Sequence, residues 1–126
     1  MAIIIKTRNP EQLLDRIHEY IKENRIKTWS YDDEGDFTTI SPQWRYKAWL
    51  HPLTTGDGET LVFGIIASRK FRMTKEIFGV YHGRFIATLL SHFDTMMTSI
   101  EATPLIHPVY DRVREQGVVF PAGNTV

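Results

Sequence analysis

The segment Thr74–Phe93 constrains the fold most, because it is the longest stretch of the chain with a helical pattern of apolar residues. At about 100° per residue, one broad side of this helix collects the large apolar side chains. These are Phe78, Val80, Phe85, Ile86, Leu89, Leu90 and Phe93. Tyr81 and Arg84 fall on the other side, and Thr74 is a typical N-cap residue. The sequence therefore predicts one long amphipathic helix that packs against the rest of the protein.

Small residues recur along one edge of this helix, at Gly79, Gly83 and Ala87. A glycine inside a helix costs about 1 kcal/mol relative to alanine, so we expect a close contact with another backbone to compensate. The same spacing is typical of helices that dimerise in membranes. Charged residues and histidines interrupt this segment, which excludes a membrane span. We therefore expect the glycine edge to pack tightly on a sheet or on a partner helix.

His82 lies within the apolar side of the helix, near Phe78, Ile86 and Leu89. One interpretation is a core histidine whose ring nitrogens bond to nearby backbone or to a tyrosine. The other is a functional imidazole with a shifted pKa, which lines a pocket between the helix and a sheet. The helical pattern places Tyr81 away from His82, which argues against a site built from both.

The composition is that of an ordinary globular domain, and it removes several function classes. The 126 residues suffice for one domain, with 42% apolar and 24% charged residues. Fifteen basic residues balance fifteen acidic ones, so net charge gives no reason to expect nucleic acid or an anionic membrane as a partner. The absence of cysteine excludes disulfides, thiolate zinc sites and cysteine nucleophiles. The first residues lack the features of a signal peptide, so we expect a cytoplasmic protein.

Helix and strand signals alternate along the chain. Asn9 and Pro10 are typical of the N-cap and the first position of a helix, and Asn24 suits the left-handed position that ends it. Apolar or alternating segments bounded by turn residues predict the strands. The predicted strands are residues 2–6, 27–32, 37–40, 46–53, 60–68 and 94–103.

This order, β-α-β-β-β-α-β, predicts a single α+β domain over residues 1–126. We expect a mostly antiparallel sheet of five or six strands, with the two long helices packed on one face. Residues 104–126 are predicted to form a short C-terminal appendage. It contains a helix at 109–116, between Pro108 and Gly117, and an edge strand at 118–120.

The second face of this sheet needs a cover. Residues 3–5 and 61–67 are apolar on both sides of their strands, although a sheet with one solvated face should alternate. Either the appendage folds over this face or a second copy of the chain does. We expect a homodimer, because an appendage of about twenty residues covers little area. Gly64 indicates a bulge or a close backbone contact, for which the glycine edge of the long helix is one candidate.

Aromatic residues are concentrated between residues 29 and 49. They are Trp29, Tyr31, Phe37, Trp44, Tyr46 and Trp49. Such residues in strands usually form the core, but a cluster this dense also suits an anchor for a partner protein or a ligand. Arg45 and Lys47 interleave with them, as in surfaces that bind nucleic acid. The carboxylates nearby argue against nucleic acid as the partner.

Basic residues before the long helix form another candidate site. Arg69, Lys70 and Arg72 precede a helix N-terminus, where anions bind. The sequence has no glycine-rich phosphate loop, no HExxH spacing, and no calcium-loop spacing in the acidic turn 32–36, so we predict no cofactor and no metal. The candidate binding residues are His82, Trp29, Tyr31, Trp44, Trp49, His51, Arg69 and Arg72.

These features favour a non-enzymatic cytoplasmic protein that works through protein contacts as a homodimer. Small bacterial accessory or immunity proteins are of this type. The alternative is a small-ligand binder, or a hydrolase of the ribonuclease kind, with a pocket around His82 and Trp49. No motif assigns catalytic residues to that alternative.

Overall fold

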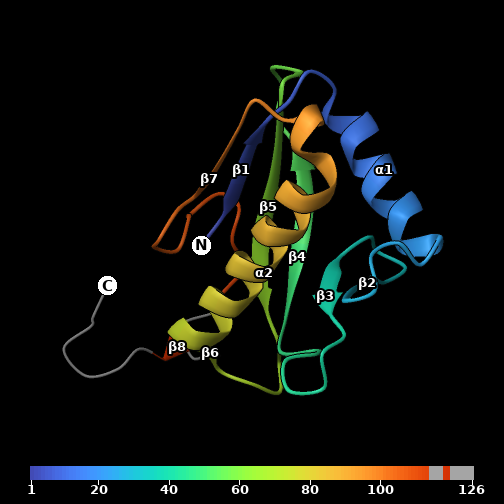
Figure 1. Ribbon diagram of the computed structural model, residues 1–126. Coiled ribbons are helices and arrows are strands. Elements are labelled where there is room, and N and C mark those ends of the chain that lie inside the picture. Colours follow the sequence, from blue (N-terminus) through green and yellow to red (C-terminus); the bar gives the residue numbers. More distant parts are fainter. Residues whose placement is uncertain (114–117, 120–126) are drawn as a thin grey trace.

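The computed structural model describes residues 1–113 and 118–119, and its centre is a six-stranded antiparallel sheet (Figure 1). The order of strands across the sheet is β2-β3-β4-β5-β1-β7. They are β1 (Ile3–Lys6), β2 (Trp29–Tyr31), β3 (Phe37–Thr39), β4 (Ala48–Thr54), β5 (Thr60–Ala67) and β7 (Ser99–Ala102). A separate parallel pair joins β6 (Met73–Thr74) to β8 (Val118–Val119). The predicted antiparallel sheet of five or six strands is confirmed.

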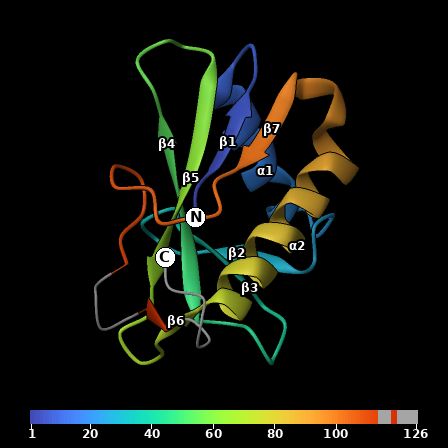
Figure 2. The same cartoon turned by 90° about the vertical axis from the view of Figure 1, so that its left-hand side faces the viewer.

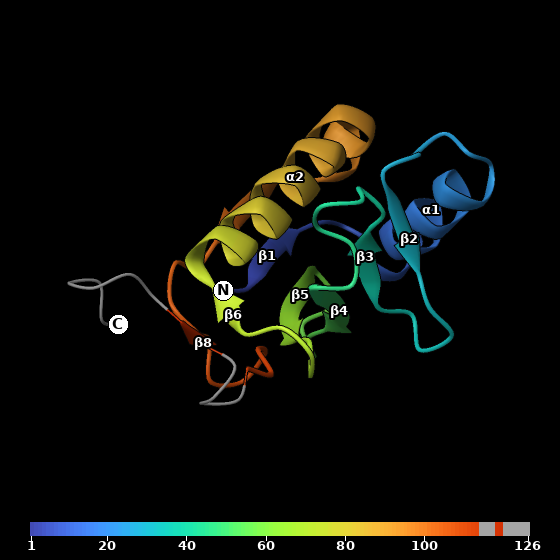
Figure 3. The same cartoon turned by 90° about the horizontal axis from the view of Figure 1, so that it is seen from below.

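Both long helices, α1 (Pro10–Lys22) and α2 (Lys75–Phe93), pack on the same face of the sheet (Figures 1 and 3). The hydrophobic core lies between these layers. Ile17 of α1 and Phe85 of α2 are buried in one cluster with Phe63 of β5. The α+β class and the predicted arrangement of the helices are therefore confirmed.

The ends of α1 follow the signals read from the sequence. The Asn9 side chain accepts a hydrogen bond from the Gln12 amide at 3.0 Å, and Pro10 occupies the first turn, where an amide hydrogen is not needed. Asn24, just beyond the helix, has the left-handed φ of 61°. These local contacts fix where the helix begins and ends before any tertiary packing is considered.

The buried side of α2 differs from the predicted one at Tyr81. Thr74 caps the helix through the Ile77 amide, as expected. Tyr81, however, was predicted to face away from the core and is fully buried. Its hydroxyl donates to the Trp44 carbonyl at 2.5 Å, and it accepts from Thr38 Oγ1 at 3.0 Å. A buried tyrosine with a satisfied hydroxyl is stable in a core, so the prediction from the helical pattern was wrong here.

The glycine edge of α2 does not make the expected close contact. Gly79 and Gly83 are exposed, and a Cβ added at either would meet no atom within 4 Å. The close contact is instead at Gly64 of β5, where an added Cβ would lie 1.8 Å from the carbonyl oxygen of Tyr110. The prediction of a tight backbone approach at Gly64 is thus correct, but its partner is the C-terminal segment rather than the helix.

Residues 104–113 run along the side of the sheet opposite the helices (Figures 2 and 3). The predicted helix at 109–116 is wrong within residues 109–113, and residues 114–116 lie outside the described part. Residue 112 instead forms a parallel bridge with Ile66. The Arg112 amide donates to the Ile65 carbonyl at 2.8 Å, and the Ala67 amide donates to the Arg112 carbonyl at 3.2 Å. The predicted edge strand at 118–120 is present as β8, and residues 120–126 lie outside the described residues.

Two strand boundaries also differ from the prediction. The strand predicted at 46–53 begins only at Ala48, because Tyr46 has a φ of 62°, which a strand does not accommodate. The segment 94–103 divides into a 3₁₀ turn, η1 (Asp94–Met96), and the short strand β7. The polar residues Asp94, Thr95 and Thr98 interrupt the apolar pattern at the start of this segment.

The second face of the sheet is covered in part by the chain itself. Val62 is fully buried there and Gly64 lies under Tyr110, whereas Ile4 is only half-buried. Of the two predicted covers, the C-terminal segment is therefore present over the middle of β5, and a homodimer remains a prediction. Within the described residues, neither helix has the length and apolar character that crossing a membrane requires.

Candidate functional site

A cavity of about 870 Å³ opens where β4 begins and β5 ends. It contains Trp49 of β4 and Ile66 of β5, which are partners in the strand register. The neighbouring Leu50 and Ile65 belong to the core under the helices, so alternation along each strand places Trp49 and Ile66 on the second face. We call this space the Trp49 cavity.

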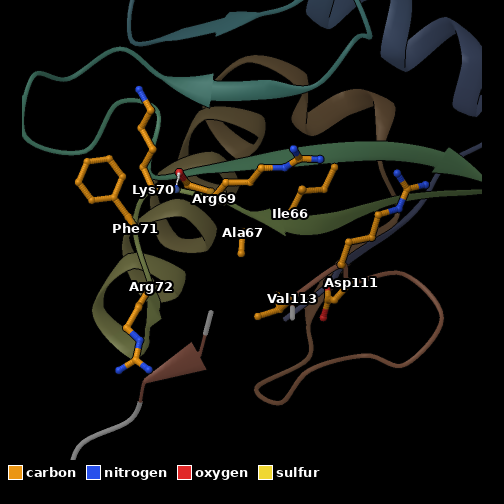
Figure 4. A pocket seen from close by; sticks show the side chains of 10 residues that line it. Ile66, Ala67, Arg69, Lys70, Phe71, Arg72, Asp111 and Val113 are labelled. Atoms are coloured by element: carbon orange, nitrogen blue, oxygen red, sulfur yellow. Dashed lines mark hydrogen bonds between the residues drawn. The ribbon is translucent and has the colours of Figure 1, made fainter. Parts of the chain in front are cut away.

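A second cavity of about 630 Å³ adjoins the first (Figure 4). Residues 66–71 and Arg112 line both cavities and form their common wall. Arg72, Asp111 and Val113 line only the second, which we call the Arg72 cavity. The two cavities therefore form one continuous depression over the second face of the sheet.

Among the residues that the structure describes, three aromatic side chains line the Trp49 cavity. Trp49 is half-buried, while Tyr46 and Phe71 have 54% and 44% of their surface exposed. Large exposed aromatic side chains at a concave surface are typical of binding sites, because their faces stack on flat ligands. The cavity thus offers ring surfaces that the core does not use.

Charged groups of opposite sign occupy different parts of the cavity wall. The positive side chains are Arg45, Lys47, Arg69, Lys70 and Arg112. The negative ones, Asp32, Glu34 and Asp36, all come from the turn between β2 and β3. Asp36 is also paired with a histidine, described below. Within the described part of the chain, the cavity wall therefore has a local excess of positive charge, although the whole chain has a formal net charge of zero.

The loop 41–47 carries one wall of the cavity, and α2 holds it in place. Trp44 is buried as its anchor, and its carbonyl accepts the hydroxyl proton of Tyr81. The left-handed Tyr46 is fixed by a hydrogen bond of 3.2 Å from its amide to Thr38 Oγ1. Bulky residues rarely adopt this backbone conformation, and such positions are concentrated at functional sites. Tyr46 thus combines an unusual backbone conformation with a place in the lining of the cavity.

Asp111 positions the opposite wall. Its carboxylate accepts hydrogen bonds from the Ile65 amide at 2.9 Å and from the His107 amide at 2.6 Å. The Met1 amino group lies 3.3 Å from the same carboxylate. These contacts hold the backbone of Arg112 against β5, so that its guanidinium reaches both cavities.

His51 and Asp36 form a close pair beside the Trp49 cavity. His51 Nδ1 lies 2.5 Å from Asp36 Oδ1, and the side chains are 22% and 7% exposed. A carboxylate bound to Nδ1 orients an imidazole as a proton acceptor in many enzymes. Asp36 lines the cavity but His51 does not, so the pair serves here to hold the turn that carries Asp36 against β4.

His82 is not part of the cavity. It is 4% exposed and lies on the helix side of the sheet. Its Nδ1 lies 3.0 Å from the carbonyl oxygen of Phe78, and its Nε2 is within hydrogen-bond distance of the carbonyl oxygen of Met1. Burial lowers the pKa of His82 to about 4, against the opposing effect of these two carbonyl groups. This is the core histidine of the first interpretation, and the structure does not bring His82 and Trp49 together.

The remaining candidate residues divide between the core and the cavities. Trp29 and Trp44 are buried, and Tyr31 is half-buried against His18 and Phe37. Arg69 lines both cavities and Arg72 lines one. The basic segment was selected because it precedes a helix N-terminus, and the structure places it at the wall of both cavities, whereas the sequence did not separate surface aromatics from core aromatics.

Sequence reasoning missed three residues of the site. Tyr46 belonged to the aromatic cluster between residues 29 and 49 but was not among the candidate binding residues, and the signal for Phe71 was its position beside basic residues. Arg112 was missed because residues 109–116 were read as a helix of the appendage. The approach of Arg112 to β5 depends on the contact between Gly64 and Tyr110, two residues that are 46 positions apart in the sequence.

The site shows no feature that assigns a metal or a known family. Among the residues that the structure describes, no group of three His, Asp or Glu side chains could hold a metal ion. Comparison of the chain with protein-family models, with curated proteins and with solved structures found no match. The function must therefore be argued from the geometry and charge of the two cavities.

Proposed function

We propose that the protein binds a phosphate-bearing ligand with a flat ring, of the kind that a nucleotide presents, in the Trp49 cavity. The observation that carries this proposal is the presence of aromatic faces and excess positive charge in one cavity. Aromatic faces stack on flat rings, and arginine side chains bind phosphate oxygens in pairs. This is the ligand-binding alternative suggested by the sequence, with Trp49 in the site and without His82.

The separation of charges supports one orientation of the ligand. The phosphate is expected at Arg69 and Arg112, which belong to the common wall of the two cavities. The ring then lies over Trp49, and its amino groups point to the carboxylates of the turn 32–36. Carboxylates accept hydrogen bonds from amino groups, so the acidic turn supports binding of the ring instead of opposing it.

Binding is tested by isothermal titration with adenosine diphosphate, adenosine and inorganic phosphate in parallel. We expect the diphosphate to bind more tightly than either fragment, because only it engages both the rings and the cations. Arg69→Gln and Arg112→Gln should each raise its Kd by about tenfold or more, since a hydrogen bond to a charged group contributes about 1.5–3 kcal/mol. Trp49→Leu should weaken adenosine as strongly as the diphosphate, because it removes the stacking surface.

Arg16→Gln is the matched control. Arg16 is an exposed arginine of α1, remote in sequence from the cavity walls, and it has only a surface ion pair with Glu19 at 3.8 Å. Its removal should leave the Kd unchanged. Equal Kd values for Arg69→Gln and Arg16→Gln, or no heat of binding with millimolar diphosphate, would refute the proposed site.

Self-association is a second proposal, supported by a separate surface. Leu105, Ile106 and Val109 of the C-terminal segment are exposed, and Val109 has 74% of its surface accessible. Exposed apolar side chains close together in sequence are typical of protein contacts. Sedimentation equilibrium tests whether a second copy covers them: a dimer that Val109→Asp converts to a monomer would support this proposal, and a monomer at high micromolar concentration would exclude it.

A further inference from the structure

We infer that the ligand is a single-stranded nucleic acid, whose successive nucleotides occupy the Trp49 cavity and the Arg72 cavity. This inference rests on the proposed function and extends it to a polymer. Its first support is size. Each cavity alone, at about 870 and 630 Å³, has the volume of a complete small-ligand pocket, and the two share one wall. One nucleotide leaves the adjoining cavity unused.

The distribution of positive charge is the second support. Arg69 extends back over Ile66, whereas Lys70 and Arg72 extend to opposite sides of the same short connection (Figure 4). A single phosphate would be bound best by cations that converge on one point. Cations spread along a groove instead follow a chain of phosphates, as in proteins that bind single strands.

The aromatic residues favour an unpaired strand over a duplex. Trp49 lines the cavity and is half-buried, so a base can stack on its ring only if the face of that base is free. In a duplex the base faces are stacked on one another, and a protein meets only the backbone and the edges of the bases in the grooves. Tyr46 and Phe71, both exposed, offer further faces for bases next to the first.

The balanced composition of the chain does not contradict this inference. The sequence argued against nucleic acid because acidic and basic residues are equal in number and carboxylates flank the aromatic segment. In the folded protein these carboxylates come from one turn, and among the described residues that line the Arg72 cavity the one carboxylate is that of Asp111. That carboxylate faces the Met1 amino group and two amides, so it is already engaged with positive partners.

Fluorescence anisotropy with labelled single strands tests the inference directly. The probes are fluorescein-labelled RNA and DNA of twelve nucleotides, each as A-rich and as U- or T-rich strands, together with a labelled hairpin duplex. We expect the single strands to bind at least tenfold more tightly than adenosine diphosphate, and at least tenfold more tightly than the duplex. The RNA and DNA arms show which sugar the site accepts. Log Kd should rise with log salt concentration, with a slope of about 0.7 for each phosphate contacted.

Arg72→Gln separates this inference from the proposed function, because Arg72 lines only the second cavity. We expect this variant to weaken single strands about threefold to tenfold and to reduce the salt slope, while its Kd for adenosine diphosphate stays unchanged. Arg16→Gln should alter neither. If the twelve-nucleotide strands bind no more tightly than the diphosphate, or if Arg72→Gln leaves them unaffected, the inference is wrong and the mononucleotide site stands. If neither probe binds, both proposals fail.

Discussion

Replacing Gly64 with alanine should detach the C-terminal segment from the sheet. The added Cβ would lie 1.8 Å from the carbonyl oxygen and 2.6 Å from the carbonyl carbon of Tyr110. Both are backbone atoms, so no change of rotamer can relieve the overlap. Since real Cβ atoms essentially never come within 3.0 Å of such neighbours, the backbone at Tyr110 must retreat by more than 1 Å. Residues 111–112 are bonded to β5 directly beside this point and must move too.

The expected loss of stability follows from the hydrogen bonds that Gly64→Ala would break. Three hydrogen bonds join this segment to β5: two between the backbone of Arg112 and the Ile65 and Ala67 groups, and one from the Ile65 amide to Asp111. At about 1 kcal/mol each, their loss costs about 3 kcal/mol. If the segment stays in place instead, the strain of overpacking costs about 1–3 kcal/mol. We therefore expect Gly64→Ala to lower the free energy of unfolding by about 2–4 kcal/mol.

Urea unfolding of Gly64→Ala and of two matched glycine variants measures this effect. Gly79→Ala and Gly83→Ala place the same methyl group in open space on an exposed helix surface, where each should stabilise the protein by about 0.5–1 kcal/mol. Amide exchange at Ile65 and Ala67 should accelerate in Gly64→Ala, while exchange in α1 tracks only the global stability. If Gly64→Ala is as stable as the wild type and keeps both amides protected, the contact between Gly64 and Tyr110 does not exist.

Three further predictions concern the core and the helix caps. Tyr81→Phe should destabilise the protein by about 1–3 kcal/mol in urea unfolding, because it leaves the Trp44 carbonyl and the Ala48 amide without their buried partner. Burial lowers the pKa of His82 from 6.5 to about 4, so the unfolded chain takes up the proton first. The free energy of unfolding should have its full value above pH 6.5 and fall by up to about 3 kcal/mol as the pH drops to 4. His82→Gln should make the free energy of unfolding less dependent on pH in this range, and an unchanged slope would contradict the lowered pKa of His82. Asn9→Ala should cost about 1 kcal/mol and Asn9→Ser almost nothing, because serine also accepts the Gln12 amide; equal losses would exclude a capping role.

The parts of the fold that were predictable are those with a local cause. The beginning and end of α1 follow from Asn9, Pro10 and Asn24, whose preferences act over a few residues. The strands with strong apolar patterns, β1 and β5, were found for the same reason. Local preference also led to an error, because residues 109–113 have helix-like flanks but form a bridge with β5. This pairing supplies hydrogen-bond partners for the residues of β5 that extend beyond β1. The need for such partners is apparent only in the assembled sheet.

The site was less predictable than the fold, because it depends on which face of the sheet each aromatic residue occupies. Trp44 and Trp49 lie five residues apart and look alike in the sequence, yet one anchors a loop in the core and the other lines a cavity. The left-handed residue Tyr46 lies between them, and no glycine or asparagine in the sequence indicates this conformation. A strand pattern that alternates every second residue through this segment therefore could not assign the aromatic side chains to the correct faces of the sheet.

The two cavities lie where residues 1–113 and 118–119 leave part of the second face uncovered. The C-terminal segment crosses β5 at Gly64 and then runs beside its last residues, so it leaves Trp49 and Ile66 open between itself and the loop 41–47. The same contacts that close the sheet over Gly64 thus hold Arg112 at the common wall of the cavities. Any change that releases residues 110–113 should therefore lower stability and ligand affinity together, whereas removal of Arg69 should lower affinity alone. This difference distinguishes residues that build the site from residues that bind in it.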